Sequence, residues 1–189
     1  MGVNIENMAI IEQIFVDFAK KIEGSVWPAN FLGVMQKSLI KENIQITPIK
    51  GKINDATVID GDTIKWNNKT IRLYGIDAPE KYQPCQNNGK EFDCGQSAKD
   101  YLRYILSGAK LDCINKGKDK WGRIIGQCMA DGEDIGSSMV KSGWAIAYRK
   151  YSLEYVSDEE YAKKAKIGMW AKDFLLPSDW RKLNKGARH

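Results

Sequence analysis

Histidine is nearly absent from this chain of 189 residues, since the single histidine is the last residue, His189. This excludes function classes that need an internal imidazole: Ser-His-Asp and Cys-His hydrolases, histidine-metal nucleases and histidine-containing zinc sites. No stretch approaches 18 uncharged apolar residues, so we expect no membrane span. Any catalysis therefore depends on carboxylates, arginines, lysines, tyrosines or a metal ion held by oxygen atoms.

The composition is otherwise that of a globular domain with one sizeable core, with 43% hydrophobic and 28% charged residues. Lys and Arg number 29 against 24 Asp and Glu, which gives a net charge of +5. Residues 1–50 are balanced in charge, so the basic excess belongs to residues 51–189. A basic domain is compatible with a polyanionic partner but does not prove one.

The four cysteines lack the CxxC spacing of zinc or redox sites. Cys113 and Cys128 flank a turn-rich segment, and Cys85 and Cys94 bracket a polar loop. We therefore predict the disulfides Cys85–Cys94 and Cys113–Cys128, which favour a secreted, periplasmic or cell-envelope protein. Four buried free thiols in a reducing cytosol are the alternative.

Residues 1–50 are expected to form an N-terminal helical extension of unknown role. Apolar residues at i, i+3 and i+4 predict a helix over 8–22 and a second one over 30–41, followed by an extended linker over 43–51. We expect a helical hairpin that packs on the domain behind it; partner docking or a lost membrane anchor are the alternatives. Acidic residues interrupt the apolar run that a signal peptide needs, so none is visible here.

Residues 51–176 are expected to form one domain of α+β class, and residues 177–189 a basic C-terminal tail. Alternating apolar residues and turn signals indicate short strands and helices. Five strands are expected at 56–59, 63–66, 70–76, 110–115 and 123–130, a further short one at 144–148, and three helices at 95–106, 134–141 and 157–166, the last of which opens on a capping box at Ser157. Five strands with helices between and after them favour a small β-barrel over a parallel sheet.

Two segments place carboxylates and an arginine near strand ends. Asp60 and Asp62 flank a glycine at a strand junction. Arg72 lies within an apolar strand that leads into a loop with Asp77 and Glu80. Taken alone, the first segment indicates an ordinary Asp-Gly turn, and the second indicates a strand whose arginine is solvated or salt-bridged.

Hairpin geometry relates these two segments. If Asn67 and Asn68 centre the turn between their strands, Asp62 lies opposite Leu73 and diagonal to Arg72. The acids and the arginine would then converge at one end of the barrel. Barrel ends of this type commonly bind nucleic acids.

Residues 119–123, Asp-Lys-Trp-Gly-Arg, add a basic and aromatic turn that alone indicates only a hairpin loop. Together the three segments supply what phosphodiester cleavage needs without histidine. Asp62 and Asp77 are hard oxygen ligands suited to Ca²⁺. Two arginines can bind phosphate oxygens in a forked manner and neutralise the developing charge. Glu80 can hold or deprotonate the attacking water.

With these motifs the chain closely resembles the thermonuclease, or staphylococcal nuclease-like, family. The resemblance runs from about Lys52 to Trp170 in the order IDGDT, IRLYGIDAPE, DKWGR and GxxW. Residues 94–98 and 143–152 resemble the short, cysteine-containing bacterial branch. The resemblance implies a five-stranded OB-fold barrel with three helices and a Ca²⁺-dependent phosphodiesterase. It also implies cleavage of DNA and RNA at the P–O5′ bond, which leaves 3′-phosphate and 5′-hydroxyl ends.

The resemblance assigns metal-binding roles to four positions. Asp62 and Asp77 match the calcium carboxylates, and Ala78 matches a position whose backbone carbonyl binds the metal. Asp60 matches an outer-shell acid that reaches the metal through water. The side chain of Ala78 is therefore expected to be unimportant.

The resemblance assigns catalytic and substrate-binding roles to six further positions. Arg72 and Arg123 match two phosphate-binding arginines, and Glu80 matches a residue that serves as general base or positions the water. Three positions match contacts to the substrate: Lys120, Trp121, which stands where a tyrosine is familiar, and Tyr148, whose alignment needs a one-residue shift.

The sequence thus favours a calcium-dependent nuclease that acts on DNA and RNA, with a monomer as the default state. The alternative, from another class, is a non-catalytic OB-fold module that binds nucleic acid or protein. A purely structural domain whose basic patch docks a partner is a third reading. Binding that is insensitive to chelators and forms no product would support either alternative.

Overall fold

The structure is a computed structural model that describes residues 48–52, 56–87 and 89–184. The predicted helices over 8–22 and 30–41 lie outside the described residues. The prediction of a linker over 43–51 is wrong at its end, because Pro48–Lys52 form strand β1. This strand pairs antiparallel with β8, so its backbone hydrogen bonds come from a distant segment that sequence periodicity does not reveal.

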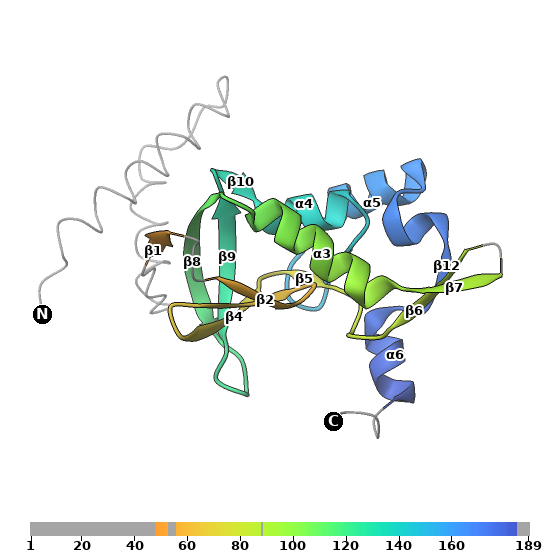
Figure 1. The fold of residues 1–189 in the computed structure, drawn as a ribbon, viewed down its shortest axis with the longest axis horizontal. Helices are drawn as coiled ribbons and strands as arrows, with labels where there is room; N and C mark the ends of the chain where they lie inside the picture. Colours follow the sequence, from red (N-terminus) through yellow and green to blue (C-terminus); the bar gives the residue numbers. More distant parts are fainter. Residues whose placement is uncertain (1–47, 53–55, 88, 185–189) are drawn as a thin grey trace, which may run out of the picture. The chain divides into compact units, whose positions relative to one another are not determined.

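Among the described elements, the strands β1 to β7 precede the first helix, α3, and strands and helices are interspersed after it (Figure 1). In chain order they are β1 (Pro48–Lys52), β2 (Thr57–Asp60), β3 (Thr63–Trp66), β4 (Lys69–Leu73), β5 (Ile76–Asp77), β6 (Pro84–Asn87), β7 (Lys90–Asp93), α3 (Cys94–Leu106), β8 (Lys110–Lys118), β9 (Ile124–Ala130), β10 (Glu133–Asp134), α4 (Ile135–Lys141), β11 (Ile146–Ala147), α5 (Val156–Ala165), the 3₁₀ helix η2 (Gly168–Ala171), β12 (Asp173–Phe174) and α6 (Pro177–Leu183). The α+β class is therefore confirmed.

The main sheet has the strand order β1-β8-β9-β4-β3-β2, and β10 pairs with β9. Its strand pairs are antiparallel except β4 and β9, which run parallel. Two smaller sheets join β11 with β5 and β12 with β6 and β7. In the described part of the chain, β1 and β2 form the two ends of the main sheet, so the expected closed barrel is not found there.

The hairpin between β3 and β4 has the register that the sequence predicted. Asn67 and Asn68 have positive φ angles of 48° and 60°, as a two-residue type I′ turn requires. Thr63 consequently pairs with Arg72. The backbone N–H of Leu73 donates to the carbonyl of Asp62 over 2.8 Å, so Asp62 does lie opposite Leu73.

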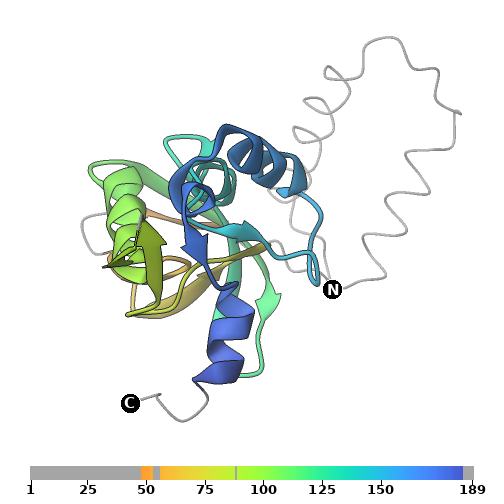
Figure 2. The same cartoon turned by 90° about the vertical axis from the view of Figure 1, so that its right-hand side faces the viewer.

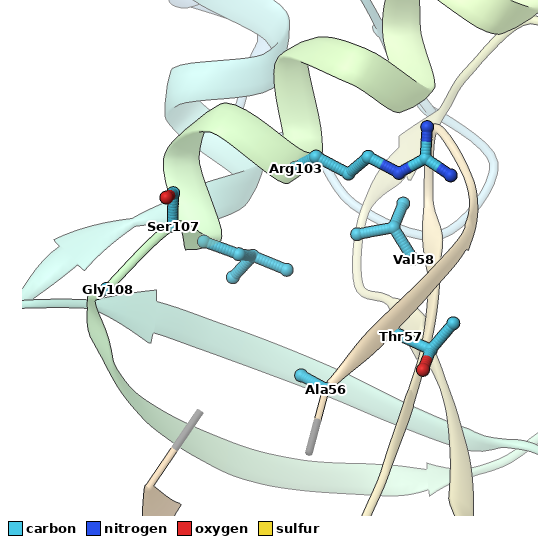
Figure 3. A pocket seen from close by; sticks show the side chains of 7 residues that line it. Ala56, Thr57, Val58, Arg103, Ser107 and Gly108 are labelled. Carbon is cyan, nitrogen blue, oxygen red and sulfur yellow. The ribbon is translucent and has the colours of Figure 1, made fainter. Parts of the chain in front are cut away.

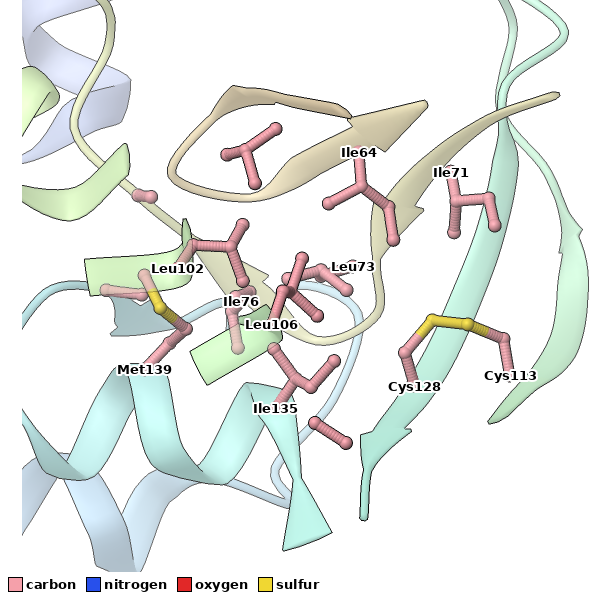
Figure 4. Close-up of a cluster of buried hydrophobic side chains, with 14 of the residues drawn as sticks. Ile64, Ile71, Leu73, Ile76, Leu102, Leu106, Cys113, Cys128, Ile135 and Met139 are labelled. Atoms are coloured by element: carbon pink, nitrogen blue, oxygen red, sulfur yellow. A yellow bond between two sulfur atoms is a disulfide. The ribbon is translucent and has the colours of Figure 1, made fainter. Parts of the chain in front are cut away.

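Apolar side chains from the main sheet and from the helices form the larger core (Figure 4). Helix α3 packs on β2 and α4, and α4 packs on β9 and α5. The most buried side chains include Ile64, Trp66, Ile71, Leu102, Leu111, Ile135 and Met139. The disulfide Cys113–Cys128 joins the paired strands β8 and β9 within this core.

The second predicted disulfide, Cys85–Cys94, is also confirmed. Its surroundings differ from the prediction of a polar loop, because β6 and β7 form a hairpin there. The disulfide joins β6 to the first residue of α3 and lies in a second, smaller core with Ile146 and Met169.

The predicted capping box at Ser157 is wrong. Helix α5 begins at Val156, and its N-cap residue, Tyr155, makes no side-chain capping hydrogen bond. Tyr155 is buried in the core and its hydroxyl donates to Asp134 over 3.1 Å. The predicted capping residue, Ser157, therefore lies inside the first turn and cannot cap the helix. We attribute the earlier start to the contact between Tyr155 and Asp134, which fixes the residue before the helix.

The C-terminal segment, expected as a basic tail, contains helix α6, which follows β12 closely (Figure 2). Pro177 occupies the first turn of α6, where its fixed φ suits a helix start, and is buried. None of the helices in the described residues is long and apolar enough to cross a membrane.

Candidate active site

The turn between β2 and β3 carries Asp62 into the protein. Gly61 is required there, since a Cβ atom would lie 2.7 Å from the Cβ of Ala78 and 2.8 Å from that of Ala98. In this close approach Asp62 is buried, with 3% of the residue exposed. One oxygen accepts from the Thr63 hydroxyl over 2.9 Å and the other from the backbone N–H of Ala78 over 3.0 Å. The Asp62 carboxylate is thus held by the next residue, Thr63, and by Ala78, which follows β5.

Arg72 joins the two predicted metal acids. Its guanidinium donates to Asp62 and, over 2.9 Å, to Asp77, whose carboxylate is fully buried. Burial alone would lower the pKa of Arg72, but the charges of Asp62 and Asp77 raise it above its ordinary value. The sequence prediction that these three residues converge is therefore confirmed.

Asp60 lies next to this cluster, and its carboxylate accepts from the backbone N–H of Asp62 over 3.1 Å. Burial and the charge of Asp62 raise the pKa of Asp60 to about 7. Burial in a low-dielectric surrounding and a neighbouring like charge both disfavour the ionised carboxylate.

The loop that carries Glu80 is held by a buried glutamine. Gln83 is 0% exposed, and its amide oxygen accepts from the backbone N–H of Glu80 over 3.1 Å. Its amide nitrogen donates to the carbonyl of Leu175 over 2.7 Å. A Cβ atom at Gly95 would lie 2.0 Å from the carbonyl oxygen of Glu80, so only glycine fits under this loop. Glu80 thus has a fixed backbone and a side chain that is 38% exposed.

Sequence reasoning missed one residue of this cluster, Arg181 of α6. Its guanidinium donates to both oxygens of Asp77, over 2.9 and 2.8 Å, and to Glu80 over 2.7 Å. Burial would lower the pKa of Arg181, but its hydrogen bonds and charge interactions with Asp77 and Glu80 raise it further. No motif includes this arginine, and the basic character of residues 177–189 was the only signal for it.

The 119–123 hairpin is built by the Asp119 carboxylate. One oxygen accepts from the backbone N–H groups of Trp121 and Arg123 over 2.9 and 3.0 Å, and the other accepts from Nε of Arg123 over 2.7 Å. Slight burial would raise the pKa of Asp119, but these hydrogen bonds together with the charge of Arg123 lower it below its ordinary value. Lys120 and Arg123 lie 4.3 and 5.2 Å from the Trp121 ring centre.

In the described residues no hydrogen bond or ion pair connects Arg123 with the acids around Asp62. Tyr148 is placed near them by its backbone, whose N–H donates to the carbonyl of Gly75 over 2.8 Å. The adjoining strand β11 pairs Ile146 with Asp77. The Tyr148 ring meets that of Tyr151 edge-on, with ring centres 4.9 Å apart.

The donor chemistry of the cluster fits a hard divalent cation. Asp60, Asp62, Asp77 and Glu80 face two guanidinium groups, which leaves an excess of two negative charges when all four acids are ionised. Oxygen ligands of this kind suit Ca²⁺. As the described side chains stand, however, no three acidic, histidine or cysteine groups are arranged around a common metal position.

A hollow of about 340 Å³ lies elsewhere, between the start of β2 and the end of α3 (Figure 3). Of the seven described residues that line it, only Arg103 is charged. It contains none of the residues that the sequence singled out. The cluster around Asp77 is therefore the better candidate for chemistry.

Comparison with known proteins identifies the family of this chain. The family described as staphylococcal nuclease homologue matches residues 70–172. The chain belongs to the staphylococcal nuclease family. The match begins two residues before Arg72 and includes Asp77, Glu80 and Arg123, but it ends before α6.

Several curated proteins are similar to this staphylococcal nuclease homologue. An uncharacterized endonuclease of Haemophilus influenzae is 35% identical over 68% of this chain and 71% of its own length. Endonuclease YhcR of Bacillus subtilis is 30% identical over 68% of this chain but only 12% of its own length. The succinoglycan biosynthesis protein ExoI of Rhizobium meliloti is 34% identical over 62% of this chain and 64%, just under two thirds, of its own length.

Proposed function

We propose that this protein is a calcium-dependent nuclease that hydrolyses phosphodiester bonds of DNA and RNA at P–O5′ and leaves 3′-phosphate products. The observation that carries the proposal is the pair of buried carboxylates, Asp62 and Asp77, bridged by Arg72. Family membership and relatives that are named endonucleases support it. An OB-fold for residues 51–176 is part of the same proposal.

The carboxylates of Asp62 and Asp77 and the carbonyl of Ala78 would hold Ca²⁺, and Asp60 would reach it through water. When bound, the ion would neutralise phosphate charge and lower the pKa of a bound water. Glu80, whose side chain is 38% exposed, would accept a proton from the attacking water or orient it. Arg72 already donates to both acids, so it orients them as well as adding positive charge.

Substrate contacts are proposed for the exposed basic and aromatic side chains. Arg123 binds Asp119 through Nε, which leaves its two terminal nitrogens outside that contact and suited to phosphate oxygens. Trp121 is 65% exposed and offers a ring on which a base could stack, with Lys120 beside it. Tyr148, which directly follows β11, would contact the nucleotide.

The two disulfides lead us to propose an oxidising location, either secreted or in the periplasm or cell envelope. A monomer remains the default state. Of the extension predicted at 1–50, we propose only the residues before β1 as separate, because β1 (Pro48–Lys52) pairs with β8 in the main sheet.

A timed digest of single-stranded DNA and RNA in Ca²⁺, in Mg²⁺ and in a calcium chelator tests this function. We expect cleavage of both substrates in Ca²⁺ only, with 5′-hydroxyl ends that a kinase labels without prior phosphatase treatment. The Glu80→Gln variant should lower the rate about 10²-fold to 10⁴-fold. Binding without product in every condition would overturn the proposal and favour a non-catalytic binding module.

A further inference from the structure

We propose that Arg181 is a third arginine of the active site and positions the Glu80 carboxylate relative to Asp77. Helix α6 would then be part of the catalytic machinery, although it lies beyond the part of the chain that matches the family. This inference rests on the proposed nuclease function, because it assigns Glu80 the role described there.

The contact has the geometry of a clamp between two acids. One terminal nitrogen of Arg181 donates to Asp77 over 2.9 Å and to Glu80 over 2.7 Å, while the other donates to the second oxygen of Asp77 over 2.8 Å. A forked, planar guanidinium can span two carboxylates in this way, whereas a lysine is a point charge. Arg181 therefore fixes where the Glu80 carboxylate lies relative to the buried Asp77.

Burial separates this clamp from an ordinary surface salt bridge. The Asp77 side chain is 1% exposed and that of Arg181 24%. Exposed pairs on the same helix, such as Lys182 with Asp179, have side chains that are 69% and 45% exposed. Ion pairs of the exposed kind contribute little, but a buried carboxylate depends on its charged partners, and Arg181 is one of the two that Asp77 has among the described residues.

One buried glutamine, Gln83, bonds the two segments that carry Glu80 and Arg181. Gln83 accepts from the backbone of Glu80 and donates to the carbonyl of Leu175, two residues before α6 begins. The Glu80 loop and the start of α6 are thus tied through one side chain. Catalysis gains from such fixed orientation, since small displacements of a reacting group lower the rate.

Steady-state kinetics on single-stranded DNA with Ca²⁺ test the role of Arg181. We expect Arg181→Met to lower kcat at least 10-fold with KM changed less than twofold, because both terminal nitrogens of the guanidinium are engaged by Asp77 and Glu80. Arg181→Lys should recover part of the loss. Lys182→Met, which removes the same charge from the neighbouring position, should leave both constants unchanged.

A double-mutant comparison separates positioning from a general structural effect. If Arg181 acts through Glu80, Arg181→Met should cause no further loss in a Glu80→Gln background, measured in single turnover at high enzyme concentration. An equal loss in both backgrounds would overturn the inference.

Calcium titration by calorimetry, without substrate, gives a readout that does not depend on turnover. Removing the cation that contacts Asp77 should tighten Ca²⁺ binding in Arg181→Met several-fold, whereas Lys182→Met should not change it. Unchanged affinity together with unchanged kcat would overturn the inference and leave the proposed nuclease intact. Absence of both Ca²⁺ binding and cleavage in the unsubstituted protein would overturn both.

Discussion

The cluster around Asp77 and the 119–123 hairpin both contain a carboxylate that pairs with arginine, but the pairs form in different ways. In the hairpin, every hydrogen bond that the Asp119 carboxylate accepts comes from a residue two or four positions away. Around Asp77, Arg72 is five positions away and Arg181 is 104 positions away. The hairpin therefore depends on local sequence and the acid cluster on tertiary structure. Substitutions in the cluster should lower stability and activity together, whereas those in the hairpin should lower activity alone.

Asp77→Asn should have the largest effect on both quantities. The amide keeps the shape of the side chain but leaves Arg72 and Arg181 without their shared buried carboxylate. We expect kcat to fall about 10³-fold and the free energy of unfolding to fall by about 3–5 kcal/mol. Urea unfolding and the calcium-dependent digest measure the two effects. Asp100→Asn, which removes an exposed partner of Arg103, is the matched control and should change neither. Wild-type stability in Asp77→Asn would contradict the tertiary origin of the cluster.

Arg123→Lys tests the hairpin, where we expect a loss of activity without a loss of stability. The lysine keeps the charge but cannot bind two phosphate oxygens in a forked manner, so we expect about a 10²-fold lower kcat/KM. The turn should persist, because the backbone N–H of Trp121 still donates to Asp119. The unfolding free energy should therefore change by less than about 0.5 kcal/mol. Lys118→Arg, the reverse exchange at a nearby exposed position, serves as control. Near-normal turnover in Arg123→Lys would remove Arg123 from its proposed role.

The two disulfides offer a matched pair of variants, one beside each region. Cys113–Cys128 joins β8 and β9, the strands that lead to the hairpin. Cys85–Cys94 lies beside the Glu80 loop, because the N–H of Cys94 donates to the carbonyl of Gln83 over 2.9 Å. Replacing either pair with alanine should cost about 3 kcal/mol of stability on the chain-entropy estimate.

Only the change at Cys85–Cys94 should also lower kcat, by a few-fold, at a temperature where both variants are folded. Thermal unfolding and the digest at 25 °C check this. Equal turnover in the two alanine variants would show that the Glu80 loop keeps its place without the disulfide.

The same contrast explains what the sequence allowed us to predict. The register that brings Asp62 to Arg72 depends on a two-residue turn at Asn67 and Asn68, and both disulfides follow from cysteines that bracket turns. These are local signals, and the structure confirms the register and both disulfides. Arg181 reaches Asp77 only because β12 pairs with β6 and delivers α6 to the site.

Other long-range features escaped prediction for the same physical reason. Strand β1 exists because it pairs with β8, and α5 begins at Val156 because buried Tyr155 precedes it. A closed barrel was expected from the number of strands, but strand number does not determine which edges meet. Each of these features depends on contacts between segments far apart in the sequence, which no local pattern contains.

Trp121→Ala should have the smallest effect and gives the finest test of a locally built hairpin. Trp121 is 65% exposed, with the Arg123 guanidinium 5.2 Å from its ring centre. Losing one base-stacking surface should raise KM for single-stranded DNA about 5-fold to 10-fold. The kcat value should stay within twofold, because Asp119 already orients Arg123 through Nε over 2.7 Å. Trp121→Tyr should keep most of the affinity. A fall in kcat with unchanged KM would instead mean that the ring, and not Asp119, holds Arg123 in place.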